Sequence, residues 1–78
     1  MKIKFGTFDK VNQFIRLAQS VNADVFVKYG KYVVDGCSVM GVYSLDLSKE
    51  FELDVIEKAD GEYDRLIAKL RELDIVTE

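Results

Sequence analysis

The chain has 78 residues but no histidine, no proline and only one cysteine. Without histidine, a nucleophile would lack its most common general base, and a metal site would depend on carboxylates. The single cysteine, Cys37, cannot form an internal disulfide, which fits a reducing compartment better than secretion. The absence of proline is compatible with uninterrupted helices and strands.

Long hydrophobic segments and basic clusters are also missing. The longest uncharged segment, residues 36–45, is too short and too polar to span a bilayer, and the N-terminus lacks a signal-peptide core. We therefore expect a cytoplasmic protein that does not enter a membrane. The net charge is −3, divided into +4 over residues 1–33 and −7 over residues 34–78. This balance argues against direct nucleic-acid binding, which needs a concentrated basic face.

The overall composition is typical of a folded protein. Hydrophobic residues make up 49% of the chain and charged residues 32%, with no low-complexity segment. At this length the chain has room for one small core, so we expect a single domain over residues 1–78.

Hydrophobic periodicity predicts the elements. Alternating residues predict strands over 23–29 and 32–34, joined by a tight turn at Gly30-Lys31, and a further strand over 50–55. A short strand is expected over residues 2–6. Helical spacing predicts one helix that ends near residues 21–22 and a last helix that starts at Asp60-Gly61.

A short helix after Ser38 completes the order βαββαβα. Residues 39–45 are apolar at most positions and can cover one side of that helix. Because the strands have one apolar face and the helices are amphipathic, we expect an α+β fold. Its form is an open-faced β-sandwich, in which a four-stranded, mainly antiparallel sheet carries three helices on one face.

The segment DGCSVMGVYSLDL, residues 35–47, resembles the regulatory-serine region of the HPr family. These proteins are the small phosphocarriers of the bacterial sugar phosphotransferase system. The resemblance extends back without a gap into the first helix and covers most of the chain. It implies an HPr-like open-faced sandwich, in agreement with the pattern of elements.

The same alignment places Thr7 where the family has its phosphorylated histidine and Asp9 where it has the arginine that steadies the phosphate. A threonine ester is too stable to pass its phosphoryl group on, and an aspartate would repel the phosphate. We therefore expect no phosphorelay. Thr7 is instead predicted to cap the first helix, with Asp9 in its first turn.

Ser38 is predicted to cap the short helix, where a phosphoserine would also be tolerated. The resemblance implies phosphorylation of Ser38 by HPr kinase/phosphorylase. It also implies an apolar docking patch for a protein partner, formed by Val39, Met40 and Tyr43. We expect Leu47 to belong to the same partner-binding surface. Two positions depart from the family, since Cys37 replaces a basic residue and Asp46 a glycine.

Two functions remain open at this point. The chain is either a regulatory adaptor, switched at Ser38, or a constitutive HPr-fold interaction module in which Ser38 is only a cap. The partners implied are HPr kinase/phosphorylase, a transcriptional regulator or a metabolic enzyme. We expect no enzyme activity, no cofactor and no metal site, with Cys37 a packing residue and the acidic residues of segment 50–54 a solvated strand face.

Overall fold

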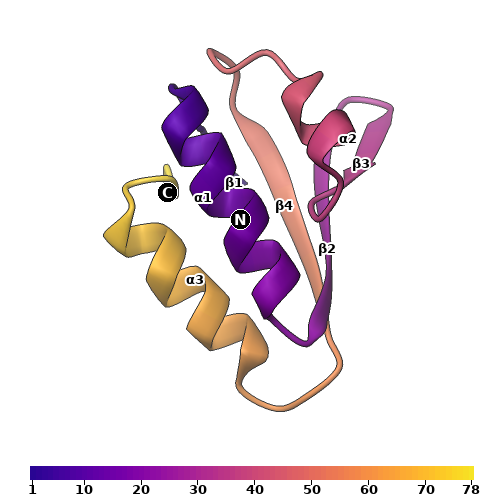
Figure 1. Cartoon of the computed structure of the whole chain (residues 1–78), viewed down its shortest axis with the longest axis vertical. Helices are drawn as coiled ribbons and strands as arrows, with labels where there is room; N and C mark the ends of the chain where they lie inside the picture. The colour runs from indigo at the N-terminus through magenta and orange to yellow at the C-terminus, as the bar shows by residue number, and fades with distance from the viewer.

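The computed structural model describes residues 1–78 and contains seven elements in the predicted order. They are β1 (Lys2–Ile3), α1 (Phe8–Ser20), β2 (Ala23–Tyr29), β3 (Tyr32–Asp35), α2 (Val39–Tyr43), β4 (Phe51–Glu57) and α3 (Glu62–Glu72). Figure 1 shows α1 and α3 side by side, with α2 near β3. The predicted α+β fold, with a four-stranded sheet and three helices, is confirmed.

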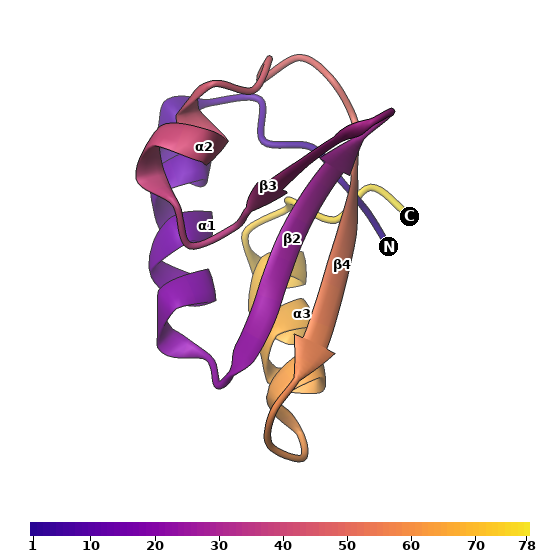
Figure 2. The ribbon, with the colours of Figure 1, turned by 90° about the vertical axis from the view of Figure 1, so that its right-hand side faces the viewer.

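The four strands form one antiparallel sheet in the order β1-β4-β2-β3. Its centre is the long pairing of β2 with β4, which runs from Ala23 opposite Glu57 to Lys28 opposite Glu52. The tight turn between β2 and β3 has Gly30 at a φ of 58°, a conformation that glycine adopts without strain. Figure 2 shows α1 and α2 on one side of the sheet, with its other side open.

The alternation of the strands decides which side is covered. In β2, Val25 and Val27 are buried, whereas Asp24 on the other face is exposed. The same division applies to β4, where Phe51 and Leu53 are buried. One cluster of 15 buried side chains joins this face to α1 and α3. Each large member stabilises the fold by about 1.5–3 kcal/mol, so this cluster is the main source of stability.

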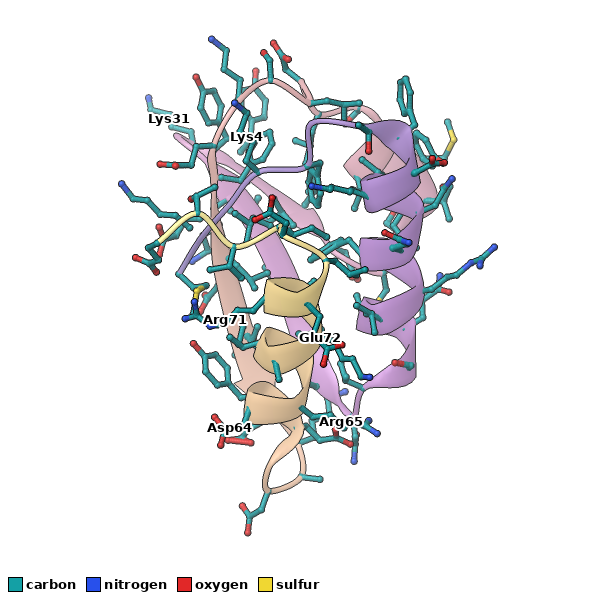
Figure 3. The ribbon with its side chains drawn as sticks, turned by 90° about the vertical axis from the view of Figure 1, so that its left-hand side faces the viewer. Lys4, Lys31, Asp64, Arg65, Arg71 and Glu72 are labelled. Carbon is teal, nitrogen blue, oxygen red and sulfur yellow. The ribbon has the colours of Figure 1, made fainter.

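Both long helices place an apolar stripe on the sheet. In α1 the buried residues are Val11, Phe14, Ile15 and Ala18, and in α3 they are Leu66, Ile67 and Leu70. Their spacing of three and four residues is that of one helix face. Figure 3 shows charged side chains such as Asp64, Arg65 and Glu72 on the rest of α3. The amphipathic pattern therefore sets how each helix lies on the sheet.

Cross-strand ion pairs lie on the open side of the sheet. Lys28 Nζ lies 3.0 Å from Asp54 Oδ2, and Lys58 Nζ lies 3.1 Å from Asp24 Oδ1. These side chains are about half exposed, so each pair adds little stability. These charged pairs contribute polar groups to the open face of the sheet, which also carries a few apolar residues.

The first strand is shorter than predicted, because it ends at Ile3 and not at Gly6. The backbone N–H of Lys4 donates to Ile75 O, and that of Gly6 donates to Leu47 O, so neither continues the pairing with β4. Gly6 also has a φ of 80°, outside the range of a strand. The chain thus leaves the sheet early and turns toward α1.

Gly36, between β3 and α2, is a buried position where any side chain would be crowded. A Cβ atom there would lie 2.9 Å from Val25 Cγ1 and 3.2 Å from Val25 O.

We expect Gly36→Ala to lower the free energy of unfolding by about 1–3 kcal/mol, because the β-branched Val25 cannot easily move. Urea denaturation measures this loss. In a Val25→Ala background the same substitution should lower stability clearly less, and an equal loss in both backgrounds would contradict the steric explanation.

Candidate partner-binding surface around Ser38

Ser38 caps α2, as the sequence predicts. Its backbone is extended, with φ −87° and ψ 113°, and its Oγ accepts a hydrogen bond from the Gly41 N–H at 3.2 Å. Its carbonyl accepts the first helical bond, from the Val42 N–H at 3.0 Å. The side chain is half-buried, and a Cβ atom on Gly41 would lie 3.2 Å from Ser38 Oγ. A glycine at position 41 therefore gives the capping hydroxyl its room.

The turn before Ser38 is held by several hydrogen bonds. The N–H of Cys37 donates to Asp35 Oδ1 at 2.8 Å, and the N–H of Ser38 donates to Asp35 O at 3.0 Å. From α1, Gln19 Nε2 donates to Cys37 O at 3.1 Å. This network fixes the position of Ser38 relative to the end of β3 and to α1.

Exposed apolar side chains lie directly beyond Ser38. Met40 is 83% exposed, Val39 is 49% exposed, and Phe8 at the start of α1 is 60% exposed. The ring of Phe8 stacks on that of Tyr43, with centroids 5.8 Å apart and an interplanar angle of 22°. We call Phe8, Val39, Met40 and Tyr43 the α1–α2 patch. Exposed large apolar groups gathered from two elements are typical of an interaction surface.

Tyr43 joins the two helices of the patch. Besides stacking on Phe8, its hydroxyl donates a hydrogen bond to Asn12 Oδ1 in α1. The stacked ring face and the hydroxyl of Tyr43 thus both hold α2 against α1. Phe8 and Tyr43 are therefore a preformed part of the patch, whereas Met40 is almost fully exposed.

The expectation that residues 39–45 cover one side of a single helix is wrong. The helix ends at Tyr43, and Val42 is fully buried while Met40 points to solvent. Leu45 lies beyond the helix and is half-buried against the core. Five residues make little more than one turn, so their side chains point in several directions.

Leu47 lies beyond the end of α2, and its role in partner binding stays a prediction. Leu47 is half-buried, packs against the core and accepts a hydrogen bond from the Gly6 N–H at 3.0 Å through its carbonyl. Phe8, which the sequence analysis did not select, exposes more of its side chain at the patch. The available signal was an apolar residue at the first helical position, outside the buried stripe of α1.

Thr7 and Asp9 have the predicted helix-terminal roles. Thr7 is the N-cap of α1, and its Oγ1 accepts a hydrogen bond from the Lys10 N–H at 3.2 Å. Asp9 lies in the first turn, where its negative charge suits the positive end of the helix dipole. The Thr7 hydroxyl is therefore already used to hold the helix.

Cys37 is half-buried, and its Sγ lies 3.3 Å from Ala18 O, to which the thiol can donate. Burial raises the pKa of this thiol above its usual range, and the nearby Asp35 carboxylate raises it further. A raised pKa lowers the thiolate fraction at neutral pH, and the thiolate is the reactive form. The surroundings of Cys37 are those of a packing residue.

The structure contains no group of three or more His, Cys, Asp or Glu side chains that could hold a metal ion. No helix has the length and apolarity needed to cross a membrane. Comparison of the chain with models of protein families, with curated proteins and with solved structures finds no match.

The raised pKa of Cys37 predicts slow modification of this thiol. Iodoacetamide at pH 8 should alkylate Cys37 in the folded protein more slowly than in urea, with the pH dependence of the folded rate displaced to higher pH. Intact mass over time measures both rates. Equal rates at every pH would contradict the role of burial, and a Cys37→Ser variant, which should gain no mass, confirms the site.

Proposed function

We propose that this protein is an HPr-like regulatory adaptor that binds a protein partner through the α1–α2 patch and is controlled by phosphorylation of Ser38. The observation that carries the proposal is the position of Ser38, immediately before Val39 and Met40 in an exposed apolar surface. The protein would act in the cytoplasm, where a single free thiol stays reduced.

The composition of the α1–α2 patch suits a protein partner. Aromatic residues and methionine are enriched at the centres of protein interfaces, and the patch offers Phe8, Tyr43 and Met40. The flexible side chain of Met40 can adapt to a partner, whereas the stacked rings of Phe8 and Tyr43 provide a rigid anchor. Because the anchor is already rigid, it loses little conformational entropy on binding.

A phosphate on Ser38 would change this surface directly. It would add a charge of about −1.5 to −2 beside Val39 and Met40, turning one edge of an apolar patch strongly anionic. Backbone N–H groups in the first turn of α2 would serve as donors to the phosphate, so the fold could accept the modification. Phosphorylation would then select between partners without unfolding the helix.

We propose an adaptor and not a phosphocarrier, because Thr7 and Asp9 do not suit phosphoryl transfer. Thr7 lacks the nitrogen nucleophile that a labile phosphoryl intermediate requires, and its hydroxyl caps α1. Asp9 adds a negative charge two residues away, which disfavours a phosphate at this end of the helix. Binding at the neighbouring patch needs neither group.

A constitutive HPr-fold interaction module is the second candidate function. It is favoured by the environment of Ser38, whose Oγ is half-buried and already engaged as a cap. It is also favoured by Cys37, which replaces a basic residue that would attract a phosphate or a kinase. In this case the α1–α2 patch would bind its partner regardless of phosphorylation.

Phosphorylation of Ser38 separates the two candidates. The protein and its Ser38→Ala variant are incubated with HPr kinase/phosphorylase and ATP, and intact mass is measured. The adaptor proposal expects one added phosphate on the parent and none on Ser38→Ala. Because Ser38→Ala also removes the cap, at about 0.5–2 kcal/mol, circular dichroism must show that the variant is folded. No phosphate on the parent would favour the constitutive module.

Both candidates require the α1–α2 patch for partner binding. Met40→Asp should abolish the capture of specific partners in quantitative affinity purification, because it places a charge in the apolar interface. Ile56→Asp is the matched control, since Ile56 is 57% exposed but lies in β4, away from the patch. Retention of every specific partner by Met40→Asp would exclude this surface.

A further inference from the structure

One edge of the sheet is closed and the other is open. At the closed edge, β1 lies against the C-terminal segment, where Ile3 bridges to Val76. The Thr77 N–H donates to Lys2 O at 2.9 Å, and the Lys2 N–H donates to Glu78 Oε1 at 3.0 Å. At the opposite edge β3 pairs only with β2, and Figure 1 shows it at the outer margin of the molecule. An open edge strand is a template for pairing with another chain.

The pairing register shows which backbone groups of β3 face outward. The Gly36 N–H donates to Val25 O at 2.7 Å. Hydrogen-bonded pairs alternate with non-hydrogen-bonded pairs in an antiparallel ladder, so residues 32 and 34 also bond to β2, whereas residues 33 and 35 do not. The N–H and C=O groups of Val33 therefore point away from the sheet, as does the N–H of Asp35. Val33 is also 56% exposed.

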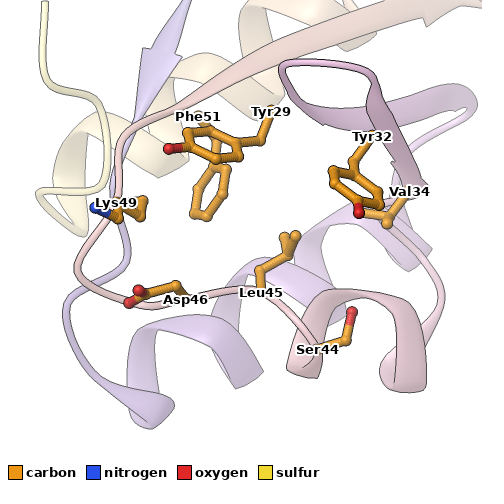
Figure 4. A pocket seen from close by; sticks show the side chains of 8 residues that line it. All are labelled: Tyr29, Tyr32, Val34, Ser44, Leu45, Asp46, Lys49 and Phe51. Carbon is orange, nitrogen blue, oxygen red and sulfur yellow. The ribbon is translucent and has the colours of Figure 1, made fainter.

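The side chains in the middle of β3 are apolar. Tyr32 and Val34 point to the covered side of the sheet and line a pocket of about 300 Å³, to which Tyr29, Leu45 and Phe51 also belong (Figure 4). We call it the aromatic pocket. In Figure 4, Tyr32 and Val34 stand on its other side from Phe51, so they form its outer wall. Tyr32 is 74% exposed, which leaves apolar surface uncovered at this edge.

A charge of each sign stands at the two ends of β3. Lys31 lies in the turn just before the strand, Asp35 is its last residue, and both are exposed. Lys31 forms no ion pair within the chain. The acidic residues near the turn are engaged elsewhere, since Glu50 lies 3.7 Å from Lys2 Nζ and Glu52 lies 2.8 Å from the N-terminal ammonium group.

Asp35 has room for a cationic partner. Its Oδ1 accepts a hydrogen bond from the Cys37 N–H at 2.8 Å, and its Oδ2 has no partner. On the same side of the neighbouring strand, Lys28 Nζ lies 3.0 Å from Asp54 Oδ2 and is therefore paired with another carboxylate. The two charged ends of β3 thus both lack an ion-pair partner within the chain.

We propose that two copies of the protein pair through β3, antiparallel about a two-fold axis beside Val33. Val33 of each copy would exchange both backbone hydrogen bonds with Val33 of the other. Tyr32 would lie opposite Val34 of the second copy, as an aromatic and β-branched pair. Lys31 would lie opposite Asp35 of the second copy, and the two-fold axis repeats this ion pair at the other end. The two sheets would become one continuous sheet.

This register is favoured over its neighbours. An axis beside Val34 would direct hydrogen bonds to the Asp35 carbonyl, which already accepts one from the Ser38 N–H at 3.0 Å. An axis beside Asp35 would place two carboxylates opposite each other, and one beside Tyr32 would leave Asp35 without a charged partner. Only the register about Val33 joins opposite charges at both ends. Because β3 contributes no residue to the α1–α2 patch, this pairing does not depend on the adaptor function.

The first test is the oligomeric state. A strand of four residues buries less surface than a standard protein interface, so we expect a weak dimer with a dissociation constant of about 0.1–1 mM. Sedimentation velocity from about 0.02 to 2 mM measures it. Amide chemical shifts of the ¹⁵N-labelled protein should change over the same range at residues 31–35. A monomer at every concentration would overturn the proposal.

A charge reversal tests the ion pairs. Lys31→Glu places a carboxylate opposite Asp35 at both ends of the interface, so the dissociation constant should rise at least about fivefold. Lys4→Glu is the matched control, because it changes the net charge equally at an exposed lysine directly after β1, at the closed edge. It should change the dissociation constant by less than about twofold. Equal effects of the two substitutions would contradict a contact between Lys31 and Asp35.

A disulfide tests the register. Opposed residues of a hydrogen-bonded antiparallel pair have Cα atoms about 5.5 Å apart, within the range of a disulfide. In a Cys37→Ser background, Val33→Cys should form a cross-linked dimer at least about fivefold faster than Ile56→Cys. The two positions are equally exposed, at 56% and 57%, and both lie on the open side of the sheet. Circular dichroism confirms that both variants are folded, and equal rates of cross-linking would overturn the pairing about Val33.

Discussion

The structure depends on the burial of one side of a four-stranded sheet beneath two helices. Val25 and Val27 in β2 and Phe51 and Leu53 in β4 point to the same side, and α1 and α3 cover them. Hydrophobic burial is the dominant favourable contribution to folding, and a chain of this length has only one core from which to obtain it. The uncovered side carries the ion pairs Lys28–Asp54 and Lys58–Asp24, beside exposed apolar residues such as Ile56.

The short helix α2 buries little of its surface in this core, and for this reason it is of functional interest. Only Val42 among its five residues is buried, while the cap at Ser38 and the contacts of Tyr43 hold the rest in place. A helix with so small a buried face leaves much of its surface free. The α1–α2 patch lies on one side of it, and the aromatic pocket begins at its C-terminal end.

Much of the fold could be predicted, because it follows from local patterns. Alternation over residues 23–29 indicates which face of β2 is buried, and helical spacing indicates the stripe of α1. The end of β1 could not be predicted, since it depends on Ile75 and Leu47, whose carbonyls take the N–H groups of Lys4 and Gly6. These partners are 71 and 41 residues away in sequence, and no local pattern reports them.

Some features of the candidate sites could likewise be predicted from the sequence, and others could not. The sequence by itself determined the helix caps at Thr7 and Ser38, because capping depends on residues three positions apart, and its lack of histidine excluded imidazole chemistry. Only the tertiary structure decided that Phe8 stacks on Tyr43 and that Tyr32, Leu45 and Phe51 line one pocket. These contacts join separate elements, and their positions are set by how the helices pack on the sheet.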